Sequence, residues 1–259
     1  MNAIYLITII AGCAAQNVLK KGFTNKRGSG GVFFFGALTA LAALLFFICS
    51  GGKLTWEPGL WVYSLGFALA YGAGTVGAVA AVHYGPLSLT GLMTSYSLLM
   101  PTLYGLIFLK DPIGLGLFPG LALLVTSLAL ITRRNDEAPI TLKWGIFVAL
   151  AFLGNGMCSV VQKMQQVAFD GRCKSEFMIL ALGMVVLFLG GGSLLRERKD
   201  LKENCKIGWY LAVFCGLSNG LVNLFVMILS GRMPVSVMFP LISAGGIVST
   251  YLFARLLYR

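Results

Sequence analysis

Nine separate stretches of this chain are apolar and long enough to cross a lipid bilayer, and no other feature limits its fold as strongly. A hydrocarbon core about 30 Å thick requires about 20 apolar residues per helix. Each backbone N–H and C=O group in such a core must be satisfied within its own segment, so the stretches are predicted to be α-helices. Only one of them carries a charge away from its ends, at Lys163. The predicted helices cover residues 3–19, 32–49, 60–83, 87–109, 113–132, 144–169, 177–195, 207–230 and 233–254.

The composition fits a membrane protein and argues against an enzyme. Hydrophobic residues make up 58% of the chain and charged residues 11%, whereas soluble domains average about 25% charged residues. The nine acidic residues, one histidine and six cysteines show no catalytic or metal-ligand spacing. The net charge of +11 comes from bases in short loops between the apolar stretches, as membrane topology requires. We therefore expect no cofactor, no metal and no nucleic-acid partner.

The distribution of Lys and Arg predicts the orientation of the chain in the membrane. Fourteen of the 20 bases lie at the C-terminus or in the loops that follow helices 3–19, 113–132 and 177–195. Five lie in the loops on the opposite side, and the remaining one is Lys163. Cytoplasmic loops are enriched in Lys and Arg, so the N-terminus is predicted to be outside and the C-terminus inside.

A repeat at an offset of about 148 residues relates the two halves of the chain. The matched pairs are Trp61 with Trp209, Gly72 with Gly220, Tyr71 with Asn219, Thr75 with Asn223 and Pro86 with Pro234. At an offset of about 143 residues, Lys20 falls on Lys163. Five helices precede the second copy, so the two copies would insert in opposite orientations. Inverted repeats are typical of secondary transporters, whose substrate site lies near the midplane between the repeats.

One loop and the Gly-rich helix that follows it carry a resemblance to a known family. Their residues are Phe108, Leu109, Lys110 and Asp111, followed by Gly114, Gly116, Gly120, Leu130 and Ile131. Together with the helix pair from Trp61 to Lys110, this pattern resembles the EamA-like family of the drug/metabolite transporter superfamily. The resemblance implies an all-α polytopic membrane protein built from two inverted five-helix repeats, here residues 1–135 and 140–259.

The chain departs from the pattern of that family in two ways. Arg259 falls on Asp111 at the repeat offset, so the second repeat is predicted to lack its last helix, which gives nine helices instead of ten. The family also usually keeps its N-terminus in the cytoplasm, whereas the distribution of Lys and Arg predicts the opposite orientation.

Polar side chains within the predicted helices are candidate substrate ligands, because polar groups are costly in lipid. In helix 144–169, polar residues recur at spacings of three to four and are predicted to share one face. They are Asn155, Ser159, Gln162, Lys163 and Gln166. Asn219 and Asn223 form a pair four residues apart, and helix 3–19 adds Gln16. This pair and its repeat partners are predicted either to line a hydrated cavity or to hydrogen-bond between helices. The predicted substrate-binding residues are Asn17, Lys20, Tyr71, Thr75, Tyr96, Asn155, Ser159, Gln162, Lys163, Asn219 and Asn223.

Lys163 is the most distinctive of these candidates, and two interpretations of it remain open. It pairs with a substrate carboxylate or phosphate, or it extends from the nearby helix end to the membrane interface. On the first interpretation, Lys163→Ala weakens the binding of an anionic substrate and leaves folding intact. No Asp or Glu lies within any predicted helix, unlike the small multidrug-resistance relatives, which use an embedded Glu to export cations. A neutral or anionic, for example amino acid-like, substrate is therefore favoured.

We accordingly expect a multi-pass secondary transporter in the cytoplasmic membrane that moves a small organic metabolite by alternating access. Its expected partners are the substrate and the lipid bilayer, with a homodimer or a partner chain also open. The alternative function is a membrane subunit or lipid-linked flippase that needs a partner chain. A membrane enzyme would need a cluster of catalytic side chains at a helix mouth. The most charged stretch, Arg196 to Lys206, is instead interpreted as a solvated cytoplasmic loop.

Overall fold

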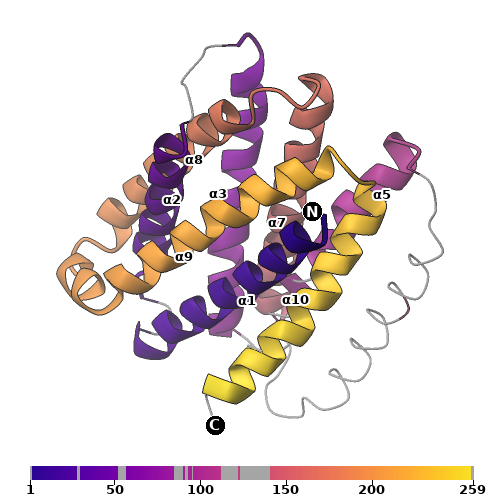
Figure 1. Cartoon of the computed structure of the whole chain (residues 1–259). Helices are drawn as coiled ribbons and strands as arrows, with labels where there is room; N and C mark the ends of the chain where they lie inside the picture. The colour runs from indigo at the N-terminus through magenta and orange to yellow at the C-terminus, as the bar shows by residue number, and fades with distance from the viewer. Residues whose placement is uncertain are drawn as a thin grey trace.

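The computed structural model describes residues 2–27, 30–51, 57–84, 90, 93–94, 96–111, 122 and 141–257, and over these residues every regular element is a helix (Figure 1). The helices are α1 (Asn2–Arg27), α2 (Val32–Cys49), α3 (Leu60–Tyr84), the 3-10 helix η1 (Tyr96–Leu98), α5 (Leu99–Phe108), α7 (Leu142–Ala168), α8 (Lys174–Arg196), α9 (Leu201–Ser230) and α10 (Val235–Leu257). The predicted helix 113–132 and the predicted boundary between residues 135 and 140 lie outside the described residues.

Five of these helices, α1, α2, α7, α8 and α9, are long and apolar enough to cross a membrane. Large apolar side chains are exposed on the outside of the molecule, with Leu187 and Leu195 of α8 at 74% and 87% exposure. Exposing an apolar surface of this extent to water is unfavourable, whereas contact with lipid is favourable. At this level the predicted all-helical membrane fold is confirmed.

Two helices extend well beyond their predicted ends into polar sequence. The predicted helix 3–19 continues to Arg27, and the predicted helix 207–230 begins at Leu201. Hydropathy identifies only the part of a helix that lies in lipid, whereas the helix itself continues for as long as its backbone groups remain paired. By contrast, the predicted helix 32–49 agrees with α2 at both ends.

The predicted helix 87–109 is not a single α-helix. Thr94 is helical, but Tyr96–Leu98 form the 3-10 turn η1 before α5 begins at Leu99. Pro101 has no N–H to donate to the carbonyl of Ser97, four residues earlier, and its ring crowds that carbonyl. The chain therefore tightens one turn before the proline, where the Ser97 hydroxyl donates to the Thr94 carbonyl at 2.6 Å.

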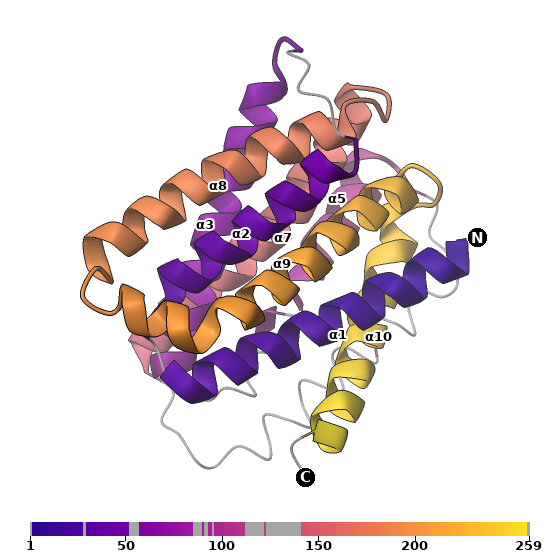
Figure 2. The same cartoon turned by 60° about the vertical axis from the view of Figure 1, so that its left-hand side comes forward.

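The longer helices form a closed ring of neighbours. In the order α8, α2, α9, α1, α10, α5, α7 and α3, each helix packs against the next, and α3 packs back against α8. Figure 2 shows the part of the ring formed by α8, α2, α9 and α1 side by side. Helices from the segments 1–135 and 140–259 alternate at every step of the ring. The two segments are therefore interleaved, and their described parts do not form separate bundles.

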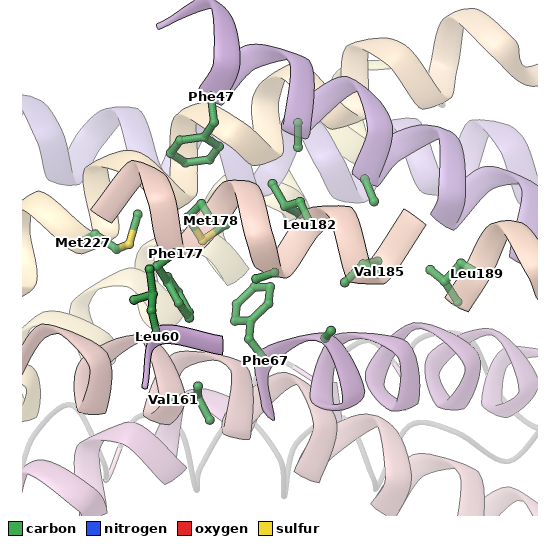
Figure 3. Close-up of a cluster of buried hydrophobic side chains, with 14 residues drawn as sticks. Phe47, Leu60, Phe67, Val161, Phe177, Met178, Leu182, Val185, Leu189 and Met227 are labelled. Atoms are coloured by element: carbon green, nitrogen blue, oxygen red, sulfur yellow. The ribbon is translucent and has the colours of Figure 1, made fainter. Parts of the chain in front are cut away.

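A large buried apolar cluster lies where α2, α3 and α8 meet (Figure 3). Phe47 of α2, Phe67 of α3 and Phe177 of α8 are almost fully buried in it. The rings of Phe67 and Phe177 meet edge to face, with their centroids 5.7 Å apart. Aromatic pairs favour this geometry because the positive ring edge faces the negative ring face.

Glycine allows α3 and α7 to approach until their backbones touch. A Cβ atom added to Gly154 of α7 would lie 2.3 Å from the backbone nitrogen of Gly74 in α3. A Cβ atom on Gly77 would lie 2.7 Å from the backbone nitrogen of Ala151. Small residues at such crossings permit the close packing on which helices in lipid depend.

Candidate functional site

Four amide side chains from three helices form a hydrogen-bonded row, here called the amide row (Gln16, Asn219, Asn223 and Gln162). Gln162 Nε2 of α7 donates to Asn223 Oδ1 of α9 at 2.6 Å. Asn223 Nδ2 donates to Asn219 Oδ1 at 3.0 Å, and Asn219 Nδ2 donates to Gln16 Oε1 of α1 at 3.1 Å. Because α7 and α9 are not consecutive in the ring, the first of these bonds crosses its interior.

The helical repeat places these amides together. Residues four apart lie on the same face of a helix, so Asn219 and Asn223 both face the interior of the ring. Asn223 Nδ2 also donates to the carbonyl of Asn219 at 2.8 Å, which holds its side chain against α9. Gln16 and Gln162 are only 7% and 4% exposed. Buried amides are costly when unpaired, and this favours the connected arrangement.

All three bonds of the amide row run in the same direction, and the row has two open ends. Gln16 Nε2 is a donor at one end, and Gln162 Oε1 is an acceptor at the other. Within the described part of the chain, neither atom bonds to a further protein group. The row thus presents both a donor and an acceptor for a polar ligand.

The structure brings together three of the predicted substrate-binding residues, Gln162, Asn219 and Asn223. The fourth member of the row is Gln16, whereas the predicted ligands Asn17 and Lys20 are exposed on α1. Consecutive residues point about 100° apart around a helix, so Gln16 and Asn17 cannot both face α9. Hydropathy alone does not reveal which of two adjacent polar residues faces inward.

The polar residues of α7 recur at spacings of three to four in one uninterrupted helix, as predicted for a single face, but they contact different neighbouring helices along its length. Asn155 lies at the contact with α3, where its Oδ1 is 3.0 Å from the position of a Cβ atom on Gly74. Gln162 instead contacts α9, and Ser159, between them along the helix, is partly buried. α7 packs against α3, α5 and α9, and side chains at different heights along it therefore meet different helices.

Lys163 and Asp111 hold the turn between α9 and α10 from two sides, and this pair is here called the turn clamp. Lys163 Nζ donates to the carbonyl of Ser230, the last residue of α9, at 2.8 Å. Asp111 Oδ2 accepts from the backbone N–H of Ser236, in the first turn of α10, at 3.2 Å. A cation at a helix C-terminus and an anion at a helix N-terminus both complement the helix dipole. The recorded bond of Lys163 is thus to backbone, at the end of a helix.

Three further predicted residues lie outside the amide row. Tyr71 stacks at a tilt on Phe67, with ring centroids 5.9 Å apart. The Thr75 methyl group is 3.2 Å from the position of a Cβ atom on Gly36 of α2. Tyr96 is buried in η1. Although Tyr71 and Thr75 match Asn219 and Asn223 in the repeat, the structure uses them in packing.

The charged stretch from Arg196 to Lys206 is not simply a solvated loop, which corrects the interpretation from sequence. Glu197 is only 9% exposed, and its carboxylate accepts from the backbone N–H groups of Phe33 and Phe34 at 3.0 and 2.8 Å. It therefore caps the N-terminus of α2 from the end of α8. The two ends of this contact are more than 160 residues apart in sequence, so no local motif predicts it.

Arg27, at the C-terminal end of α1, joins the same charged stretch. Its NH1 atom lies 2.8 Å from Glu203 Oε1, and its Nε atom donates to Asn204 Oδ1 at 2.7 Å. Asn204 is fully buried although it lies in the charged stretch. The C-terminal end of α1 and the N-terminal end of α9 thus meet at one end of the molecule, which fits the assignment of the loops after the predicted helices 3–19 and 177–195 to the same side of the membrane.

The chemistry available at the amide row is recognition of polar groups. Carboxamides donate and accept hydrogen bonds, but they neither titrate near neutral pH nor act as strong nucleophiles. Over the residues that the structure describes, no group of three or more His, Cys, Asp or Glu side chains could hold a metal ion. The row is therefore suited to binding and orienting a polar solute.

Comparison with known proteins gives information on the fold alone. No family model matches the chain, and no curated protein matches it. Among the solved structures that match, one described as "Crystal structure of protein" superposes with a TM-score of 0.77 and 16% sequence identity. The match covers 100% of this chain and 88% of the other. The arrangement of helices therefore occurs in an experimentally solved protein.

Proposed function

We propose that this protein is a secondary transporter that moves a small polar organic metabolite across the cytoplasmic membrane by alternating access. The observation that carries the proposal is the amide row, which crosses the interior of a ring of apolar helices. Polar side chains at such positions are costly in a membrane, and they mark substrate pathways by default.

The order of helices in the ring supports two inverted repeats as the basis of this transport. Exchanging α1 with α7, α2 with α8, α3 with α9, and α5 with α10 reproduces the same ring of neighbours. These are the pairs that the sequence offset of about 148 residues, or 143 for the first pair, relates. Inverted repeats bind substrate between them, and the amide row joins α1 of the first repeat to α9 and α7 of the second.

Membership of the EamA-like family is part of the same proposal. It rests on the sequence pattern around Asp111 and on the order of helices in the ring. The orientation that we propose places the end with Arg27 and Glu197 in the cytoplasm, because most Lys and Arg residues lie on that side.

Transport by the purified protein in sealed liposomes tests this function. We expect saturable uptake and counterflow for a member of a radiolabelled panel of sugars, nucleosides, amino acids and organic acids. Asn219→Leu, which removes the central amide of the row, is expected to abolish uptake. Gln166→Met is the matched control, because Gln166 lies on α7 and bonds to Gln165 rather than to the row. Folded, reconstituted protein that transports no member of a broad panel would contradict the proposal.

A further inference from the structure

We infer that the solute bound at the amide row is uncharged and carries closely spaced donors and acceptors, as polyols and carboxamides do. The inference rests on the proposed function and names the substrate class of the same site. It depends on two features of the described structure: the composition of the amide row and the positions of the charged side chains around it.

The amide row recognises hydrogen-bonding groups without supplying charge. Its four members are all carboxamides, and its two open ends are the Gln16 Nε2 donor and the Gln162 Oε1 acceptor. A hydroxyl or amide group of the solute both donates and accepts hydrogen bonds, so it can replace one partner in any of the three bonds within the row. A solute of this kind therefore replaces its bonds to water with bonds to the row.

The interior cation is placed away from the amide row. Lys163 Nζ binds the carbonyl of Ser230, which lies seven residues beyond Asn223 on α9. Seven residues correspond to about 10 Å along a helix. The Asp111 carboxylate, which forms the other half of the turn clamp, also acts electrostatically on Lys163. The ammonium group thus already has both a backbone acceptor and a nearby anion.

The other described charged side chains near this part of the ring are exposed or already paired. Lys20 is exposed on α1, and Arg27 at the end of that helix pairs with Glu203. Glu197 caps α2. Among the described residues, an ionised carboxylate at the row would therefore lose its hydration without gaining a buried counter-ion, which is strongly unfavourable. An uncharged polar solute avoids that cost.

Matched pairs of neutral and charged ligands test the inference on the detergent-purified full chain. The probes are nicotinamide with nicotinate, malonamide with malonate, ribose with ribose 5-phosphate, and xylitol with choline as the cationic member. A ligand that binds only the folded state raises the melting temperature by mass action. We expect a saturable rise in melting temperature with one or more neutral members and none with the charged members.

Substitutions in the amide row then locate the site. Asn219→Leu and Gln162→Met keep side-chain size, and each is expected to raise the ligand concentration needed for half-maximal stabilisation about tenfold or more. Gln166→Met should leave that concentration unchanged. Lys163→Met is expected to lower the melting temperature of the free protein while preserving the preference for neutral ligands.

Two results would overturn the inference in distinguishable ways. Stabilisation by the anionic members that disappears in Lys163→Met would show that Lys163 holds a charged substrate, leaving the proposed transport function intact. A folded sample that no ligand stabilises, and that also transports nothing in liposomes, would overturn the proposed function together with the substrate class. Because the ligand panel is read on the unsubstituted chain, the test does not depend on any variant folding.

Discussion

Two glutamates at the charged end of the molecule differ in what surrounds them. Glu197 is 9% exposed and accepts two backbone N–H bonds from α2. The Glu203 side chain is 59% exposed and pairs with Arg27. Exposed ion pairs contribute little stability because water and salt screen them, whereas a buried carboxylate at a helix N-terminus contributes more.

Glu197→Gln is therefore expected to destabilise the protein by about 1 kcal/mol, because it removes the negative charge from the N-terminus of α2. Glu203→Gln should lower the stability of the protein by less. Thermal unfolding of the two purified variants, measured side by side in detergent, compares them. Equal losses in melting temperature would contradict the assignment of Glu197 as the cap of α2.

At the residue scale, sequence spacing predicted part of the amide row but not how it connects. The pair Asn219 and Asn223 follows from a spacing of four on one helix, and Gln162 from its place among polar residues. The row also depends on which side chain of Gln16 and Asn17 faces α9, and on a bond between positions 203 residues apart. Rotation about a helix axis is set by tertiary packing, which a single sequence does not display.

Two glycines of α3 show how strongly helix contacts in this molecule depend on side-chain size. A Cβ atom on Gly77 would meet the backbone of α7, with Ala151 N at 2.7 Å and Phe147 O at 3.0 Å. No described atom lies within 4 Å of a Cβ atom on Gly72, five residues earlier. The same substitution therefore meets backbone at one site and open space at the other.

Gly77→Ala is expected to force α3 and α7 apart and to lower the yield of monodisperse protein and its melting temperature. Gly72→Ala is expected to be neutral or to stabilise by up to about 1 kcal/mol, because alanine is the better helix former. Size-exclusion profiles and thermal unfolding of the two variants measure the contrast. A stable, monodisperse Gly77→Ala protein would show that the two helices do not touch at this point.

At the element scale, hydropathy predicted where the helices lie and missed how two of them begin or end. The polar ends of α1 and α9 continue as helix and contact one another through Arg27, Glu203 and Asn204. The break at η1 follows from Pro101, whose effect on the preceding turn was visible in the sequence. The apolar run around it nevertheless favoured a single uninterrupted helix.

At the scale of the whole molecule, the ring alternates between the two segments of the chain, so each helix takes both ring neighbours from the opposite segment. We expect residues 1–135 and 140–259, expressed separately, to aggregate or be degraded, because neither can bury its helix contacts alone. Expressed together with a tag on one segment, they should co-purify as a complex. A monodisperse, thermally stable preparation of either segment alone would contradict the interleaved ring.

The orientation in the membrane can be checked with two exposed cysteines, Cys49 and Cys205. Cys49 ends α2, about 27 Å along that helix from the end that Glu197 caps, whereas Cys205 lies in the charged stretch itself. In single-cysteine variants, an impermeant maleimide added to intact cells should label Cys49, and it should label Cys205 only after permeabilisation. The reverse pattern would place the N-terminus in the cytoplasm.

The hydrogen bond between Gln16 and Asn219 also has a consequence for how the protein is made. The two residues are 203 positions apart, and a ribosome adds about 5–20 residues per second. For roughly 10–40 s, α1 is therefore in or near the membrane while α9, which packs along it, has not yet been synthesised. During that interval the glutamine amide must be sheltered by the insertion machinery, by water or by a temporary partner helix. The speed of translation thus sets how long the glutamine amide waits for its partner during assembly of the ring.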